Sequence, residues 1–211
     1  MTDLREPTAP TYYDRRAAEY DDWYLGLGLF AKRERPGFAE ELEAVGRALA
    51  ALEPATTLDV ACGTGFLTRH LPGAITGLDQ SSGMLDAARG RIPGATFVQG
   101  DGLALPFPDA SFDRVVSGHF YGHLDEGQRR TFLAEARRVG DELVLVDASL
   151  GRSEVSEEWS TRTLNDGSQW SVFKRWFTAD GLLEEIGGGV TLFDGDWFVV
   201  VCSPSRLVSI V

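Results

Sequence analysis

The spacing of apolar residues predicts two amphipathic helices in the first quarter of the chain. Over residues 12–24 the apolar side chains recur at the helical repeat, as Tyr13, Tyr20 and Tyr24 illustrate, and charged residues take the other side. A second apolar stripe predicts a helix over residues 38–52, which Pro54 ends. Residues 1–10 show little periodicity and predict a flexible arm.

From residue 55 onward, short apolar runs alternate with helical patterns. Strand-like runs are found at residues 57–61, 74–79, 96–99, 112–117 and 143–147. Helical patterns cover residues 66–71 and 126–139, and Ser81 or Ser82 can cap a further helix between the second and third strands. Strands that alternate with helices form a parallel sheet covered on both faces, which predicts an open, doubly wound α/β fold. The runs are largely apolar and do not alternate with polar residues, which fits strands buried on both faces.

The last third of the chain has a different pattern. Asp166 and Gly167 predict a turn within a mixed segment, and Thr178 can cap a helix over residues 179–186 that the glycines after it end. Two apolar runs, at residues 190–193 and 197–202, flank an Asp-Gly-Asp turn. This arrangement is typical of a hairpin, so we expect the sheet to finish with an antiparallel pair.

Composition and charge narrow the choice of function. A chain of 211 residues with 43% hydrophobic and 25% charged residues is long enough for one folded domain with a sizeable core. The net charge of −12 disfavours nucleic acid as a partner. The paired arginines at 129–130 and 137–138 fit a helical pattern, so we interpret them as a solvated helix face.

Cysteine usage and the apolar runs bear on the compartment. The two cysteines, Cys62 and Cys202, form neither a disulfide framework nor a zinc motif, so no metal site is predicted. The first residues lack the apolar core of a signal peptide, and no run reaches the length that spans a bilayer. We therefore expect a cytoplasmic protein without membrane association.

Small and acidic residues gather where the predicted strands end. The sequence DVACGTG follows the first strand, and its glycines permit a tight turn before a helix N-terminus. Asp79 ends the second strand, Asp101 follows the third, and His119 follows the fourth. Carboxyl ends of parallel strands meet at one edge of the sheet, where such folds bind ligands. A lone Gly-x-Gly is also common as a plain structural turn, but four converging strand ends favour a ligand that carries a ribose and a base.

The motifs LDVACGTG, GLDQSSGML, GDGLALPFPDASFD and ELVLVDAS resemble, in order, those of class I S-adenosylmethionine-dependent methyltransferases. The chain is most similar to small members of the ubiquinone and menaquinone biosynthesis group, over residues 12–150. Nicotinamide enzymes favour a third glycine, and here Thr68 stands in its place. The resemblance implies a Rossmann-like, mostly parallel seven-stranded sheet with a C-terminal antiparallel hairpin and an N-terminal helical lid.

The resemblance also implies an organisation for the single domain. We expect a lid at residues 12–52, a cofactor-binding core at 55–149, an acceptor-side insertion at 150–178, and a final helix and hairpin at 179–203. The implied cofactor is S-adenosylmethionine, which is released as S-adenosylhomocysteine.

Family positions assign roles to individual residues. Gly63 and Gly65 are expected to line the methionine part of the cofactor, with Asp59 at its amino group, Asp79 at the ribose, and Asp101 at the adenine. The full set of expected cofactor-binding residues is Tyr12, Tyr13, Tyr20, Asp59, Ala61, Gly63, Gly65, Asp79, Gln80, Met84, Asp101, Gly102, Leu103, Ser117, Gly118 and His119. The three tyrosines are also explained by plain core packing, and both interpretations stay open.

The methyl acceptor is less clearly defined by the sequence. Trp23, Tyr24, Phe30, Trp159, Trp170, Phe173 and Trp176 fall in the lid and the insertion and suggest an apolar or aromatic small molecule, although they also fit a lid packed on the sheet. No basic patch marks a phosphorylated substrate, but Arg162, Lys174 and Arg175 could bind one.

His119 is the candidate catalytic residue, as a general base or a positioning group. His123 matches a position that is often histidine in the family, and His70 fits a helix end. Cys62 is interpreted as a core residue. The alternative function is a cofactor-binding protein without methyl transfer, or an enzyme of another reaction type. The oligomeric state is not predicted.

Overall fold

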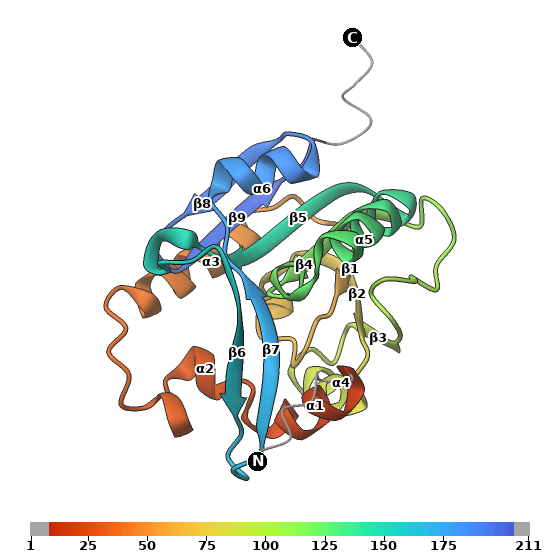
Figure 1. The fold of residues 1–211 in the computed structure, drawn as a ribbon. Helices are drawn as coiled ribbons and strands as arrows, with labels where there is room; N and C mark the ends of the chain where they lie inside the picture. Colours follow the sequence, from red (N-terminus) through yellow and green to blue (C-terminus); the bar gives the residue numbers. More distant parts are fainter. Residues whose placement is uncertain (1–8, 205–211) are drawn as a thin grey trace.

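The computed structural model describes residues 9–204, which form a seven-stranded sheet in the order β3-β2-β1-β4-β5-β9-β8 (Figure 1). The strands are β1 (Ala55–Val60), β2 (Gly73–Asp79), β3 (Thr96–Gln99), β4 (Phe112–Gly118), β5 (Gly140–Ala148), β8 (Val190–Asp194) and β9 (Phe198–Cys202). β1 to β5 pair in parallel, whereas β9 runs antiparallel to both β5 and β8. The predicted doubly wound sheet with its C-terminal hairpin is confirmed.

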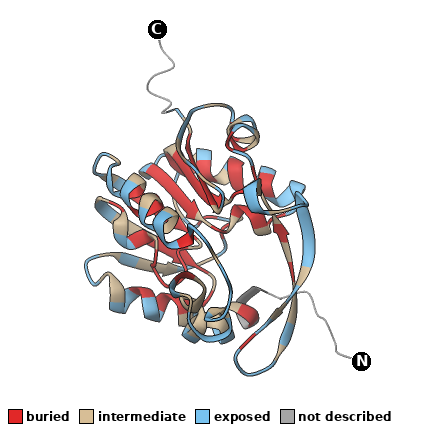
Figure 2. Ribbon diagram, turned by 90° about the vertical axis from the view of Figure 1, so that its left-hand side faces the viewer, coloured by how far each residue is buried: buried red, intermediate tan, exposed pale blue. Residues whose placement is uncertain are grey.

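Helices cover both faces of the sheet, which explains why apolar residues in its central strands point to both faces. In β5, Leu143 and Leu145 pack into a cluster with α5 (Glu126–Val139) and α6 (Ala179–Ile186), on one face. Val144 and Val146 point to the other face and pack with α3 (Phe38–Ala50). α4 (Ser82–Arg91) contacts β2 and β3. The central strands are accordingly the most buried part of the molecule (Figure 2).

Side-chain caps fix the helix starts that the sequence predicted. The Ser81 hydroxyl accepts the Met84 N–H at the start of α4, and the Thr178 hydroxyl accepts the Gly181 N–H at the start of α6. Asp125 and Gln128 form a reciprocal capping box at α5. The C-terminal end of α6 is closed by Gly187 in the left-handed conformation.

The N-terminal lid differs from the single helix expected over residues 12–24. It is divided into α1 (Ala9–Arg16), a 3-10 turn η1 (Ala17–Glu19), α2 (Asp22–Leu25) and a second turn η2 (Gly28–Phe30). The break brings the Asp21 carboxylate to the Thr64 hydroxyl, at 2.6 Å, and to Arg91, so tertiary contacts override the local helical pattern. Of the predicted arm, residues 1–8 lie outside the described residues, and Ala9 and Pro10 begin α1.

The insertion after β5 forms a hairpin that the sequence analysis did not predict. After a short 3-10 turn, η5 (Leu150–Arg152), strands β6 (Glu157–Thr163) and β7 (Gln169–Arg175) pair as a separate two-stranded sheet around the expected Asp166-Gly167 turn. The hairpin extends away from the main sheet toward α1 (Figure 1). Its tip meets the lid where the Asn165 N–H donates to Glu19 at 2.7 Å.

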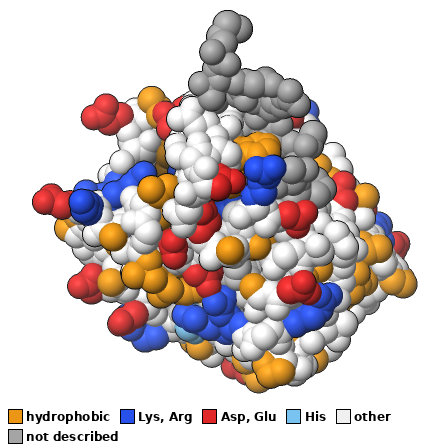
Figure 3. All heavy atoms as spheres, turned by 90° about the horizontal axis from the view of Figure 1, so that it is seen from below, with side chains coloured by type: hydrophobic (Ala, Val, Ile, Leu, Met, Phe, Trp, Pro, Cys, Tyr) orange, Lys and Arg blue, Asp and Glu red, His pale blue; other side chains and the backbone are white. Residues whose placement is uncertain are grey.

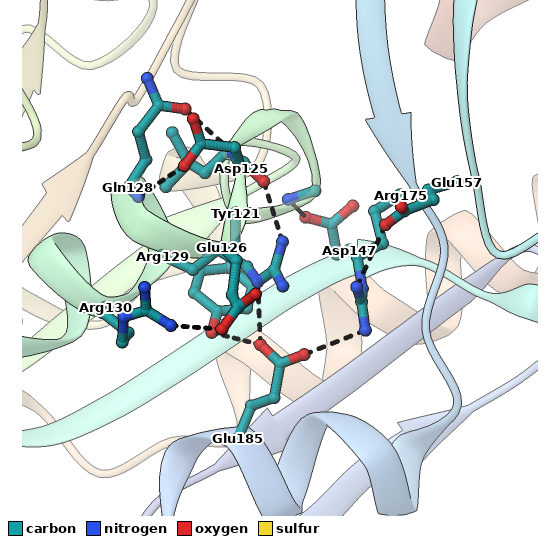
Figure 4. Close-up of polar contacts among 12 residues, drawn as sticks. Tyr121, Asp125, Glu126, Gln128, Arg129, Arg130, Asp147, Glu157, Arg175 and Glu185 are labelled. Carbon is teal, nitrogen blue, oxygen red and sulfur yellow. Dashed lines mark hydrogen bonds and ion pairs between the residues drawn. The ribbon is translucent and has the colours of Figure 1, made fainter.

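A partly buried polar cluster attaches the base of this hairpin to α5, α6 and the turn after β4 (Figure 4). Glu185 of α6 accepts the Tyr121 hydroxyl at 2.6 Å and Arg129 Nε at 3.0 Å, and it pairs with Arg175 of β7 at 3.3 Å. Tyr121 belongs to the 3-10 turn η4 (Tyr121–His123) after β4. Because Arg175 also pairs with Glu157 of β6, the cluster holds both hairpin strands.

Charged side chains of both signs share the lower face of the molecule. In Figure 3, Lys and Arg side chains lie among Asp and Glu side chains on the part of this face that the described residues form. This mixture differs from the continuous basic stripe that nucleic-acid-binding proteins present.

Candidate active site

A strained turn follows β1 at the carboxyl edge of the sheet. Ala61, Gly63 and Gly65 all have positive φ, of 58°, 55° and 75°. Gly63 makes the turn possible without steric cost, and its N–H donates to Asp79 Oδ2 at 2.9 Å. The end of β1 is thereby fixed to the end of β2. The predicted helix at residues 66–71 is reduced to a 3-10 turn, η3 (Thr68–His70).

A cavity opens directly above this turn, and we call it the turn cavity. It spans about 540 Å³, including solvent space at its open mouth. Its lining comprises Tyr13, Tyr20, Ala61, Gly63, Leu78, Asp79, Gln80, Met84, Gly100, Gly102, Gly118, His119 and Phe120. Most of the residues expected to bind the cofactor therefore meet in one place, from both the lid and the sheet edge.

The residues of the turn cavity fit the parts of S-adenosylmethionine. Each Asp79 oxygen accepts one backbone N–H, from Gly63 or Ser81, which leaves a second lone pair on each for ribose hydroxyls. Burial raises the pKa of Asp79, and the backbone donors oppose that rise. Leu78, Met84 and Phe120 supply apolar surface for a base, and the tyrosine rings can face a sulfonium.

Several expected residues lie outside the lining of the turn cavity. Asp101 turns back on its own loop and accepts the Leu103 N–H at 2.9 Å, and the Ser117 hydroxyl donates to the Val60 carbonyl at 2.9 Å. Gly65 instead permits close packing, because a Cβ there would lie 3.2 Å from Ile92. Leu103 packs against the core cluster of α5 and α6.

Asp59 lines a neighbouring side cavity that shares Tyr20, Ala61 and Gly118 with the turn cavity. Its carboxylate accepts the Thr68 hydroxyl at 2.6 Å and is 3% exposed. Burial, with a smaller contribution from the charge of Asp79, raises the pKa of Asp59 to about 7 against the effect of that hydrogen bond. An amino group at this position would favour the ionised carboxylate.

A wider cleft lies between the lid and the β6–β7 hairpin, and we call it the lid cleft. It spans about 1030 Å³, including solvent space at its mouth. It is lined by Tyr12, Tyr13, Arg16, Tyr20, Trp23, His119, His123, Ala148, Ser149, Arg152, Arg162, Val172, Lys174, Trp176, Asp196 and Trp197. Of the aromatic residues expected near the acceptor, Trp23 and Trp176 line it. Trp159 is 56% exposed, and Trp170 packs on Tyr12. Tyr12 lines this cleft rather than the turn cavity.

His119 stands between the two spaces and lines both. Its backbone has a φ of 56°, and its N–H donates to the Val146 carbonyl at 2.8 Å, so the left-handed conformation points the ring toward the site. Trp23 packs edge-on against the ring at 5.1 Å between centroids. His119 Nε2 is buried and has no hydrogen-bond partner among residues 9–204.

Burial decides the charge of both histidines near the site. Desolvation lowers the pKa of His119 to about 4, although Asp147, 3.9 Å from Nδ1, opposes this. Desolvation likewise lowers the pKa of His123 to about 3, and its Nδ1 lies 2.6 Å from the Phe173 carbonyl. Both imidazoles are therefore neutral near pH 7. Asp147 is itself paired with Lys174 and accepts the Gly122 and Ala148 N–H groups.

Leu78, Gly100 and Phe120 line the turn cavity but were not singled out from the sequence. Each directly precedes or follows an expected residue, namely Asp79, Asp101 or His119. The expected site residues were found by their position at the ends of predicted strands. Their sequence neighbours could have been included on the same basis.

The described residues hold no group of histidine, cysteine and acidic side chains arranged to bind a metal ion. None of their helices combines the length and the apolar character needed to cross a bilayer. Cys62 and Cys202 are buried free thiols.

Comparison with known proteins defines the class. Residues 57–141 match the family model described as a methyltransferase domain. The solved structure described as the DhpI-SAM-HEP complex is 26% identical, covers 92% of this chain and 95% of its own, and superposes with a TM-score of 0.72. A segment of the chain thus resembles a methyltransferase domain, and the chain shares its fold with solved S-adenosylmethionine-dependent methyltransferases.

Curated relatives agree with this class. A demethylmenaquinone methyltransferase of Thermotoga maritima is 36% identical over 136 residues, which cover 60% of this chain and 54% of that protein. A fatty-acid O-methyltransferase of Mycolicibacterium smegmatis is 36% identical over 129 residues, covering 56% of this chain and 45% of that protein. The aligned segment thus spans about half the length of these relatives.

Proposed function

We propose that this protein transfers a methyl group from S-adenosylmethionine to a small-molecule acceptor bound in the lid cleft. The observation that carries the proposal is the wall shared by the two spaces. Tyr13, Tyr20 and His119 line both the turn cavity and the lid cleft. A cofactor in the first and an acceptor in the second would meet at these side chains.

The residues of the turn cavity receive the following roles. Asp79 binds the ribose hydroxyls, and Met84 and Gln80 lie against the adenosine. The backbone at Gly63 and Gly118 flanks the methionine part, and Asp59 binds its amino group from the side cavity. The lid at residues 12–52, the core at 55–149, the insertion at 150–178 and the final segment at 179–203 then act as one domain around the two ligands.

The bound cofactor supplies an activated methyl group on its sulfonium. The protein therefore has to align the acceptor behind that methyl group and exclude water, and alignment alone can supply roughly 7–11 kcal/mol of the barrier. Tyr13 and Tyr20 close the space from the lid, and His119 contacts both ligands. Because the imidazole is neutral with a pKa of about 4, we assign His119 a positioning role rather than that of a strong base.

Two measurements test the proposal. Calorimetric titration with S-adenosylhomocysteine should show binding to the native protein, and Asp79→Ala should weaken that binding at least tenfold. Asp86→Ala, an exposed carboxylate on α4 paired with Arg89, is the matched control and should bind normally. Absence of binding at millimolar concentration contradicts the proposal.

The second measurement separates an enzyme from a binding protein. S-adenosylhomocysteine release should be detected from a panel of phenols, amines, quinols and organic acids. Binding without turnover on any acceptor class favours the alternative of a cofactor-binding protein without methyl transfer. We expect no turnover with nucleic acid, in line with the acidic chain.

A further inference from the structure

The lid cleft holds two arginines that no carboxylate of the described residues neutralises. Among residues 9–204, no Asp or Glu oxygen lies within ion-pair distance of Arg16 or Arg162, although both side chains line the cleft. Arg16 donates to the Tyr12 hydroxyl at 2.6 Å, and its Nε is buried without a partner in the described part of the chain. Buried guanidinium groups normally find an anionic or hydrogen-bonding partner.

The other cations of the lid cleft are already paired. Lys174 is buried against Asp147, and Arg152 lies 3.9 Å from Asp196 while stacking over Trp197. Arg175, which the sequence suggested as a phosphate contact, belongs to the cluster around Glu185 and does not line the cleft. The free positive charge of the cleft is therefore concentrated on Arg16 and Arg162.

These two arginines oppose each other electrostatically. Burial lowers the pKa of Arg162, and the charge of Arg16 lowers it further. Against the effect of burial, the rings of Tyr12 and Tyr20, which lie under the Arg16 guanidinium, raise its pKa. An anion bound beside both arginines would relieve the remaining repulsion. The net charge of the protein is −12, so acidic residues are plentiful in the sequence. Even so, none of those in the described residues pairs with Arg16 or Arg162.

We propose that Arg16 and Arg162 form a seat for an anionic group of the methyl acceptor, either a carboxylate or a phosphoryl group. Guanidinium groups bind such oxygens through paired hydrogen bonds, and the Tyr12 hydroxyl, which accepts from Arg16, keeps its own proton to donate. This inference rests on the proposed methyl transfer. It changes the expectation of a simply apolar acceptor to one that is anionic at one end and packs against Trp23 and Trp176 elsewhere.

The methionine carboxylate of the cofactor is a second source of the same chemistry. Neither arginine lines the turn cavity, whereas both line the lid cleft, and this favours the acceptor as the source. The two sources make different predictions, because an acceptor seat leaves the affinity for S-adenosylhomocysteine unchanged when an arginine is removed.

The test uses isosteric probes on the full chain saturated with S-adenosylhomocysteine. Titration calorimetry with phenylacetate and phenylphosphonate should show binding, and neutral phenylacetamide should bind at least tenfold more weakly. Arg16→Gln and Arg162→Gln should each weaken anion binding at least tenfold. Arg15→Gln is the matched control. Arg15 is next to Arg16 in the sequence, but its guanidinium is exposed and pairs with Asp166, so this variant should leave anion binding unchanged.

The outcomes are distinct. Equal affinity for phenylacetamide and phenylacetate, no anion binding to the native protein, or unchanged anion binding in both arginine variants overturns the seat. A tenfold loss of S-adenosylhomocysteine affinity with anion binding retained assigns the arginines to the cofactor and also overturns it. Arg162→Lys retains the charge and should recover part of the anion affinity if Arg162→Gln folds poorly. Anion binding by a protein that fails to bind S-adenosylhomocysteine would refute the methyl transfer while leaving the seat intact.

Discussion

Asp59 is a buried carboxylate whose ionisation should control cofactor binding. Burial raises its pKa to about 7, and the ionised form is the one that attracts an amino group. The dissociation constant for S-adenosylhomocysteine should therefore fall roughly eightfold between pH 6 and pH 7.5, as the carboxylate loses its proton. Asp59→Asn should bind more weakly at pH 7.5 and show little change over this range. The same pH dependence in Asp59→Asn would rule out this carboxylate as its origin.

The same group opposes stability when no ligand is present. Its folded-state pKa, about 7, lies above the unfolded value, so the folded chain holds the proton more tightly. The contribution of Asp59 to the free energy of unfolding is then lost as pH rises from about 4 toward 7. A binding site that keeps such a carboxylate sacrifices some stability for function.

His119 should act by position, and its substitution distinguishes this role from that of a base. Asparagine tolerates the left-handed backbone at this residue, where φ is 56°, so His119→Asn should preserve the local fold. We expect kcat to fall by up to about tenfold, whereas loss of a general base costs about a hundredfold or more. Steady-state rates with an acceptor found in the panel would measure this. His70→Asn, outside both spaces, serves as the control.

The pH profile offers an independent check on the same residue. Because desolvation lowers the pKa of His119 to about 4, its protonation should produce no break in kcat near pH 6.5. A break near pH 6.5 that disappears in His119→Asn would contradict the assigned environment of the ring.

At the level of residues, the sequence could place a side chain at the sheet edge but could not give its direction. Asp79 faces the turn cavity because its oxygens are oriented by the Gly63 and Ser81 N–H groups. Asp101 occupies the matching place after the next strand, yet it accepts the Leu103 N–H in its own loop and the side-chain amide of Gln80 after β2. Whether such a carboxylate faces the turn cavity depends on a few hydrogen bonds that form only in the folded chain.

Among the elements, the β6–β7 hairpin is attached at its base through Glu185 of α6. Glu185 joins α6 to Tyr121, Arg129 and Arg175, so Glu185→Ala should leave several buried donors without an acceptor. We expect a loss of about 1–3 kcal/mol in the free energy of unfolding, because the carboxylate is partly exposed. Denaturant unfolding measures this, with the exposed neighbour Glu184→Ala as control. Equal stability of both variants would show that the cluster in Figure 4 does not hold the hairpin.

Helices whose ends are marked by capping residues were predicted closely. Elements whose form depends on contacts with distant parts of the chain were not. Thr178 caps α6 as predicted, and a capping box at Asp125 begins α5 at the predicted residue, so the predicted bounds of both helices agree with the structure. β6 and β7 are rich in polar residues and pair outside the main sheet, so neither an apolar run nor strict alternation marked them. The lid lost its continuous helix because Asp21 turns toward Thr64 and Arg91, a contact invisible in local periodicity.

At the scale of the whole molecule, two spaces are built from different kinds of structure. The turn cavity rests on strand ends of the main sheet, whose spacing is set by the fold. The lid cleft shares strand-end residues such as His119 and Ala148, but much of its wall comes from the N-terminal segments and a hairpin outside that sheet. The matched family segment, residues 57–141, ends before the hairpin begins. This division explains why the cofactor was predictable from the motifs while the acceptor was not.

Binding of the product cofactor should stabilise the whole chain, because the turn cavity joins the lid to β1, β2 and α4. Tyr13 and Tyr20 close it from the lid, and Met84 closes it from α4. A ligand at a hundred times its dissociation constant adds about 2.7 kcal/mol to the free energy of unfolding. For a chain of this length that corresponds to a rise in Tm of roughly 5–10 °C. Thermal unfolding with saturating S-adenosylhomocysteine should show this rise, and adenosine at the same concentration should give a smaller one because it does not reach Asp59. A rise as large with adenosine would mean that the methionine part contributes nothing, and that Asp59 and the side cavity have another role.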